Sequence, residues 1–411
     1  MPRSSLVLVL ALSLLVSLPA AAKRRAVQPP VPLTREALSA VAAKVAARAA
    51  WAHAPRLHWE NAVLFDGFVL AGEQMNLHQP GSGDALIARA ASVLLDSDDD
   101  IAGVSWADGT AYAQAALDLY RVLPPSDPRR ERLLGLLDGP MRFAGHAVRA
   151  TPPEAAPRDP WWIPGGYGAR FWQDDLYMVV PWLSLYGSTR HGLPGNELAR
   201  NLAYEWIEAY VHEHRPESGE PVPSLRARRG ALLWSEEHAL FRHEPNHADE
   251  FFWARGNGWA LVALARAAEA LDAPYTGGRY DQVVGAGELR EMLRASAESL
   301  LARQGGDGGW SSYLARPEEC PDAETSGTAL LTFFLARGVN EGWLDRDVYT
   351  PAILRATSLL VRRVDAQGDV IGIQPPDIGP NCGKIGSDNG RVNVNHGPGA
   401  LLLALSEVMK M

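Results

Sequence analysis

Apolar residues recur every three to four positions along most of the chain, a spacing that is typical of α-helices. Alternation of apolar and polar residues, which would indicate strands, is rare. Proline-rich stretches at 152–164 and 215–223 predict loops, because proline disrupts a helix interior. The Gly-, Pro- and Asn-rich segment 366–395 predicts a longer loop. Between these breaks the pattern predicts twelve helices, at residues 33–52, 59–77, 83–96, 108–123, 129–149, 173–187, 196–214, 255–271, 287–304, 324–338, 346–364 and 396–410.

The predicted helices alternate in character along the chain. Odd-numbered helices carry scattered Arg, Glu and Ala, whereas even-numbered helices start with polar and aromatic residues and then become apolar. The even-numbered openings read WENAV (59–63), WADGTAY (106–112), WQDDLYM (172–178), WARGNGW (253–259), ETSGTA (324–329) and NHGPGA (395–400). A polar start on an apolar helix is typical of an inner helix whose end borders a cavity. We therefore predict an all-α fold, an (α/α)6 barrel of six helical hairpins whose six inner openings converge on one face. An open superhelix of helical repeats is the competing architecture.

The first 22 residues have the pattern of a secretory signal peptide. Arg3 precedes a mostly apolar run at 6–18, and Pro19 and an alanine-rich end follow it. The run is shorter than the about 20 residues that a membrane-spanning helix needs. We therefore expect cleavage near Ala22, a single catalytic domain over 23–411, and export to the periplasm or the medium.

Composition excludes several classes of protein. Hydrophobic residues make up 47% of the chain, which is too high for a disordered chain. The formal net charge is −9, whereas a nucleic-acid-binding surface would need to be basic. Two cysteines are too few for a disulfide scaffold. In an exported protein Cys320 and Cys382 could pair, and two unrelated buried thiols are an equally good interpretation.

The segment FWQDDLYM (171–178) places two adjacent carboxyl groups, Asp174 and Asp175, at the start of a predicted helix. Asp is common there because it caps the first backbone N–H groups. Neighbouring side chains point in different directions on a helix, so one Asp remains available for the cavity. Aromatic neighbours would desolvate that Asp and raise its pKa, which suits proton donation.

The segment FWARGNGW (252–259) is the most specific signal in the chain. Its two glycines indicate tight backbone packing or a ligand close to the backbone. Arg255 can bind a carboxylate through two hydrogen bonds. Trp253 and Trp259 can lie flat against a sugar ring, although each alone is typical of a core residue.

His243 and Asp108 are further candidates near predicted helix openings. The HEPNH segment spaces His243 and His247 like metal ligands, but Pro245 forbids a regular helix there, so we expect a hydrogen-bonding His and no metal. Asp108 opens a predicted helix, where capping is the simplest role. The sequence contains no Gly-rich phosphate loop, HExxH or GxSxG motif, so we expect no cofactor. Carboxylate chemistry in an aromatic, Arg-bearing cavity remains, which is typical of carbohydrate cleavage.

WQDDLYM, the LFxH segment, WARGNGW and ETSGTA occur in the order found in glycoside hydrolase family 105, the unsaturated rhamnogalacturonyl hydrolases. The chain resembles this family, and its relative family 88, the unsaturated glucuronyl hydrolases, from about residue 59 to the end. The resemblance implies an (α/α)6 barrel that acts on lyase-generated oligosaccharides with an unsaturated uronic acid at the non-reducing end. It implies catalysis by protonation at C4 and addition of water at C5, with Asp174 as the single acid and base. It also implies substrate-binding roles for the residues Asp108, His243, Trp253, Arg255 and Trp259.

Two segments depart from the family pattern, and several questions stay open. The loop 151–171 contains Trp161, Trp162 and Tyr167 and could act as a lid or an extra sugar subsite. The segment 374–395 lacks the compact pattern expected before the last helix. Galacturonyl or glucuronyl preference, the next sugar and the oligomeric state are not predicted, and no nucleic-acid or membrane partner is expected.

The alternative functions come from other classes of protein. An inverting glycosidase on saturated glycans would need a second essential acid such as Asp108. A non-catalytic sugar-binding barrel would tolerate loss of Asp174. A protein-interaction superhelix gives no reason for WARGNGW.

Overall fold

The computed structural model describes residues 33–52, 57, 59–96, 107–149, 172–211, 233–243, 252–278, 283–374 and 395–411. Contacts divide the chain into Met1–Pro30 and Val31–Met411, and all described residues belong to the second unit. The expected signal peptide, residues 1–22, lies outside the described residues and stays a prediction, as does the extent of the domain 23–411. None of the described helices combines the length and apolarity needed to cross a bilayer.

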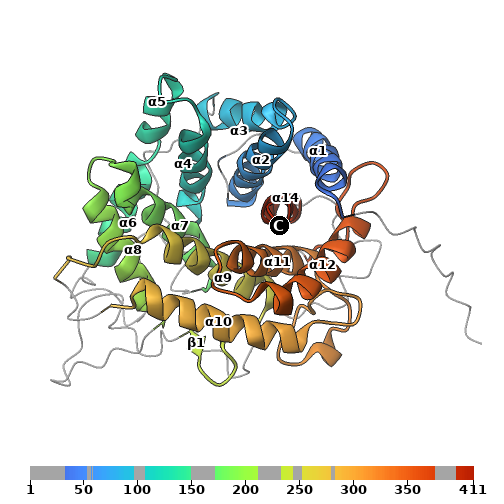
Figure 1. Cartoon of the computed structure of the whole chain (residues 1–411). Coiled ribbons are helices and arrows are strands. Elements are labelled where there is room, and N and C mark those ends of the chain that lie inside the picture. Colours follow the sequence, from blue (N-terminus) through green and yellow to red (C-terminus); the bar gives the residue numbers. More distant parts are fainter. Residues whose placement is uncertain are drawn as a thin grey trace, which may run out of the picture. The chain divides into compact units, whose positions relative to one another are not determined.

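Six inner helices form a closed ring. They are α2 (Trp59–His78), α4 (Tyr112–Val122), α7 (Asp174–Gly187), α9 (Ala254–Ala270), α11 (Thr325–Asn340) and α14 (His396–Val408). Each inner helix contacts the next along the chain, and α14 contacts α2, which closes the ring (Figure 1). The predicted (α/α)6 barrel is therefore confirmed, and the open superhelix is excluded.

The outer layer surrounds this ring (Figure 1). It consists of α1 (Arg35–Ala52), α3 (Asp84–Asp96), α5 (Arg129–Gly135), α6 (Asp138–Arg149), α8 (Asn196–Val211), α10 (Ala286–Arg303) and α12 (Arg346–Arg362). Short 3₁₀ turns are η2 (Ala107–Thr110), η3 (Thr189–His191) and η5 (Pro317–Glu319). One small antiparallel hairpin pairs β1 (Trp234–Ser235) with β2 (Leu240–Phe241).

Burial explains why the inner and outer helices differ in sequence. In α9, 16 of 17 residues are buried, so every face of the helix packs against other parts of the protein. In α10, 5 of 18 residues are buried, and these lie at i, i+4, i+7, i+8 and i+11 along one stripe. The inner helices thus form the core, and each outer helix covers them with one face.

Two predicted helices differ from the structure for local reasons. The range 129–149 is split after Gly135, because Pro140 has no N–H to donate to the carbonyl of Leu136. Proline is tolerated in the first turn of a helix, so the chain restarts as α6. The range 108–123 opens as the 3₁₀ turn η2 before α4 begins at Tyr112.

Two glycines allow α2 and α14 to approach closely. A Cβ on Gly67 would lie 2.8 Å from the carbonyl oxygen of Gly399. A Cβ on Gly399 would lie 2.7 Å from the backbone of Val63 and Leu64. Any larger residue would push apart the two helices that close the ring.

Gly399→Ala should therefore lower the free energy of unfolding by about 2 kcal/mol, although alanine normally favours a helix over glycine. Gly287→Ala is the matched control, because no atom lies within 4 Å of the added Cβ in α10. This control should be neutral or stabilising by up to about 1 kcal/mol. Thermal unfolding of both variants tests the contact, and equal effects would contradict it.

Candidate active site

The amino-terminal ends of the inner helices meet at one end of the barrel. The Trp59 ring, at the start of α2, stacks on His396 of α14 with centroids 5.5 Å apart. It also meets Trp259 of α9 edge-on at 6.3 Å. Arg255 of α9 donates to the Ser326 hydroxyl of α11 at 3.4 Å. The helix openings therefore converge, and most of the predicted site residues lie within them.

Asp174 is the first residue of α7 and carries a strongly perturbed carboxyl group. Its Oδ1 is buried and has no hydrogen-bond partner among the described residues. Burial raises the pKa of Asp174 to about 7, and the nearby Asp108 carboxylate also raises it. The Arg255 guanidinium offsets part of this rise. Asp174 can therefore hold a proton near neutral pH and still lose it readily.

Asp108, in η2, is the electrostatic partner of the carboxyl pair at the start of α7. Burial raises its own pKa to about 6. Its negative charge raises the pKa of both Asp174 and Asp175. The structure thus brings the predicted Asp108 and Asp174 into electrostatic contact.

Asp175 has structural partners that Asp174 lacks among the described residues. Its Oδ2 accepts a hydrogen bond from the Tyr210 hydroxyl at 2.9 Å and from the Trp172 backbone N–H at 3.4 Å. Burial raises its pKa to about 8, and the Asp108 charge adds to this, whereas the Tyr210 hydrogen bond opposes it. Asp175 thus holds the start of α7 against α8.

The three functional candidates of WARGNGW are all buried, with exposed fractions of 3% for Trp253 and 1% each for Arg255 and Trp259. Trp259 packs against Tyr177 with ring centroids 4.6 Å apart. The Arg255 guanidinium lies 4.3 Å from the Trp253 ring centroid, a cation–π contact. Neither indole presents an open face here, so their contact with a sugar ring stays a prediction.

The glycines of this motif serve backbone packing. A Cβ on Gly256 would overlap the side chain of Gln173, at the start of α7. A Cβ on Gly258 would lie 2.5 Å from the Cβ of Leu330 in α11. The motif therefore contains glycine where α9 meets its neighbours on both sides.

Asn257 attaches the hairpin to α9. Its Oδ1 accepts from the Phe241 N–H at 2.7 Å, and its Nδ2 donates to the Phe241 carbonyl at 2.9 Å. The same Nδ2 donates to the Trp253 carbonyl at 3.0 Å. The side chain of Asn257 thus pairs with the backbone of β2 as a neighbouring strand would. The sequence did not predict this contact, because it did not predict the hairpin.

His243 follows β2 and enters the cluster through this hairpin. Its ring is stacked on Trp172 at 6.0 Å and meets Trp253 edge-on at 5.2 Å. Its carbonyl accepts from the Gln173 N–H at 3.4 Å. His247 lies outside the described residues, and within the described part of the chain no group of three His, Cys, Asp or Glu side chains could hold a metal ion.

Several residues around the site were missed at the sequence level. Trp59 and His396 lie in helix openings that the sequence predicted, but nothing in the sequence indicated that their rings stack on each other. Gln374 stands in the predicted loop 366–395, where an amide gives no signal, yet it is fully buried among the site residues. Cys320 is disulfide-bonded and packs against Trp253, whereas Cys382 lies outside the described residues.

The loop 151–171 and nearly all of 374–395 also lie outside the described residues. Their proposed contributions to substrate length therefore stay predictions.

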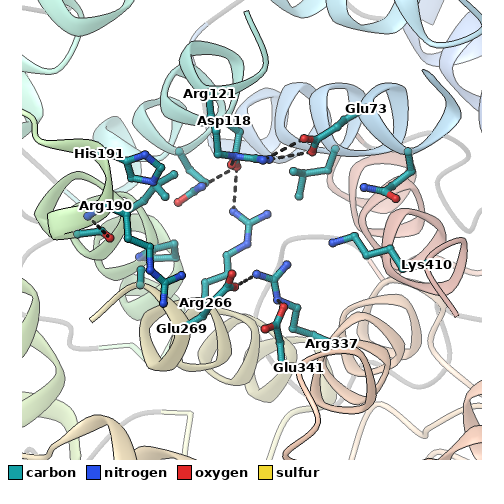
Figure 2. A pocket seen from close by; sticks show the side chains of 17 residues that line it. Glu73, Asp118, Arg121, Arg190, His191, Arg266, Glu269, Arg337, Glu341 and Lys410 are labelled. Carbon is teal, nitrogen blue, oxygen red and sulfur yellow. Dashed lines mark hydrogen bonds and ion pairs between the residues drawn. The ribbon is translucent and has the colours of Figure 1, made fainter. Parts of the chain in front are cut away.

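A charged cavity lies at the opposite, carboxyl-terminal ends of the same helices (Figure 2). It has a volume of about 290 Å³ and is lined by paired charges, including Arg121 with Glu73 and Arg266 with Asp118. No Phe, Trp or Tyr lines it, and none of the predicted site residues does. The barrel thus has an acidic, aromatic end and an ion-paired end, and the candidate site belongs to the first.

Comparison with known proteins agrees with this geometry. The sequence model of the family described as Glycosyl Hydrolase Family 88 matches residues 39–411. A curated relative from Formosa agariphila, named unsaturated 3S-rhamnoglycuronyl hydrolase, is 31% identical over 252 residues, which are 61% of this chain and 58% of that protein. The chain therefore matches little more than half the length of that relative.

Solved structures share the fold. A glycosyl hydrolase family 88 protein from Bacteroides vulgatus has a TM-score of 0.64 at 23% identity, covering 92% of this chain and 100% of that one. A possible member of the GH105 family from Salmonella enterica has a TM-score of 0.64 at 16% identity, with 93% and 96% covered. Both families that the sequence motifs indicated are thus represented among its structural neighbours.

Asn257→Ala should destabilise the protein by about 2 kcal/mol, because it leaves the buried N–H of Phe241 without its acceptor. Hydrogen exchange should accelerate in the segment 240–243. Asn201→Ala is the control, since it removes hydrogen bonds to Thr276 from an exposed position and should cost under about 1 kcal/mol. Similar losses in both variants would contradict the role of Asn257.

Proposed function

The chain belongs to glycosyl hydrolase family 88, and on that premise we propose that it removes the 4,5-unsaturated uronic acid from the non-reducing end of lyase-generated oligosaccharides. The observation that carries the proposal is the Asp174 carboxyl group, whose pKa of about 7 suits a group that donates a proton and then accepts one. The name of the relative from Formosa agariphila supports the same reaction class.

The name of the relative from Formosa agariphila also supports a choice of substrate class. We propose an unsaturated uronic acid joined to rhamnose as the first substrate to test, with and without a 3-sulfate. Export of the protein is a further part of the proposal, supported by the signal-peptide pattern of residues 1–22.

The chemistry needs one carboxyl group used twice. Asp174 gives its proton to C4 of the enol ether, and the C4=C5 electrons form the new C–H bond, which leaves an oxocarbenium ion at C5 and the ring oxygen. The Asp174 carboxylate then takes a proton from water as its oxygen bonds to C5. Cleavage of the bond between C5 and the ring oxygen gives a ketone at C5 and a hemiacetal at C1. Collapse of that hemiacetal expels the neighbouring sugar.

The residues around Asp174 fit these two roles. Burial and the Asp108 charge keep the proton on Asp174 before reaction. The Arg255 charge stabilises the carboxylate once the proton has left. The rings of Trp253, Trp259 and His243 are buried near the helix openings, and their contact with the sugar ring is part of the proposal.

Asp174→Asn should reduce turnover of an unsaturated uronyl-rhamnose disaccharide by at least about 10²-fold, because an amide cannot donate the proton. Loss of the ultraviolet absorbance of the double bond measures the rate. Asp345→Asn, at the cap of the outer helix α12, is the control and should retain activity. Wild-type cleavage of saturated glycans alone, with a second essential acid at Asp108, would instead support an inverting glycosidase.

The activity should also fall as the pH rises through about 7, because Asp174 must be protonated at the start of the reaction. Removing a charge next to Asp174 should shift the pH at which activity is lost, and the sign of that charge determines the direction of the shift. Arg255→Met should move the alkaline limb of kcat/KM to higher pH, since Arg255 lowers the pKa of Asp174. Asp108→Asn should move it to lower pH, since Asp108 raises that pKa. Shifts of the opposite sign would show that another group supplies the proton.

A further inference from the structure

Gln374 is a fully buried amide surrounded by residues of the candidate site. It is the last described residue before 375–394, and it stands between the openings of α9, α11 and α14. Neither its loop position nor the proposed chemistry explains why an amide is buried there. Its contacts divide into those of the side chain and those of the backbone.

The side-chain oxygen binds an indole. Oε1 of Gln374 accepts a hydrogen bond from Trp253 Nε1 at 2.7 Å and another from the Ser312 hydroxyl at 2.7 Å. Both distances are those of well-formed hydrogen bonds. A buried indole N–H needs an acceptor, and this acceptor selects one orientation of the ring.

The backbone of Gln374 binds three inner helices. Its carbonyl accepts from Arg255 Nη1 of α9 at 2.6 Å and lies 3.3 Å from His396 Nε2 of α14. Its N–H donates to Oε1 of Glu324, which caps the first turn of α11. One residue therefore joins the openings of three inner helices.

We propose that Gln374 is a positioning residue of this site, whose side chain sets the orientation of Trp253 and whose carbonyl sets that of Arg255. The Trp253 ring lies 4.3 Å from the Arg255 guanidinium and 5.2 Å from the His243 ring, so its orientation also shapes the surfaces of its two neighbours. The kinetic part of this inference rests on the proposed function, whereas the hydrogen bond itself does not.

The hydrogen bond can be tested without any substrate. In protein labelled with ¹⁵N-tryptophan, Trp253→Phe removes one of the 13 indole signals and thereby identifies it. Gln374→Met, which keeps the side-chain length but has no strong acceptor, should move that signal upfield in the proton dimension. Gln304→Met removes a similarly hydrogen-bonded amide after α10 and should leave it in place. An unmoved Trp253 signal in Gln374→Met would overturn the assignment.

Kinetics then separate positioning from folding. Gln374→Met should raise KM for the unsaturated disaccharide about tenfold and change kcat by less than about twofold, because a misoriented contact weakens binding throughout the reaction. Trp253→Phe removes the same hydrogen bond from the other side, so the double variant should bind no worse than the weaker-binding single variant. Gln304→Met should leave KM unchanged.

Additive effects in the double variant, or an equal rise in KM for Gln304→Met, would overturn the proposal. Trp253→Phe carries the kinetic test alone if Gln374→Met does not fold, and an unchanged KM in that variant would also refute it. Absence of turnover by the wild-type protein would refute the proposed function while leaving the indole measurement valid.

Discussion

The site depends on the balance of charge around one buried carboxyl group. Burial makes the ionised form of Asp174 unfavourable, and Asp108 adds to this effect, whereas Arg255 opposes it. If burial acted without Arg255, the carboxylate that the proposed proton transfer leaves on Asp174 would be too costly to form. If Arg255 acted without burial, the proton would be lost below neutral pH. The pKa of about 7 is the result of both influences.

The charges that set the pKa of Asp174 come together because the inner helices of the barrel all run in the same direction. The starts of α7 and α9 bring Asp174 and Arg255 to the same end, and helix starts favour negative charge. The opposite ends, which favour positive charge, carry Arg121, Arg337 and Lys410. Glu407 there illustrates the contrast, because burial would raise its pKa but Arg337 and Lys410 lower it to about 2. The pKa of Glu407 is thus lowered where that of Asp174 is raised.

Sequence reasoning predicted the helices and the barrel well, because inner and outer helices differ in how much of their surface is apolar. It also placed Asp174, Arg255 and His243 near the helix openings, where the structure has them, while their roles in catalysis and binding stay predictions. It missed the break before Asp138, which lies inside a continuous apolar pattern. It also missed the hairpin, because strands of two residues are too short to show an alternating pattern. Gln374 could not be found, because its role arises from contacts with residues 22 to 121 positions away.

The proposed reaction begins with protonation of C4 by Asp174. Turnover of the unsaturated disaccharide in D₂O, followed by NMR from the first product formed, tests this step directly. Protonation by Asp174 predicts deuterium at C4 of the released uronic acid and loss of its double bond. Release of a uronic acid that retains the double bond and carries no deuterium at C4 would show that the glycosidic bond is cleaved by another route.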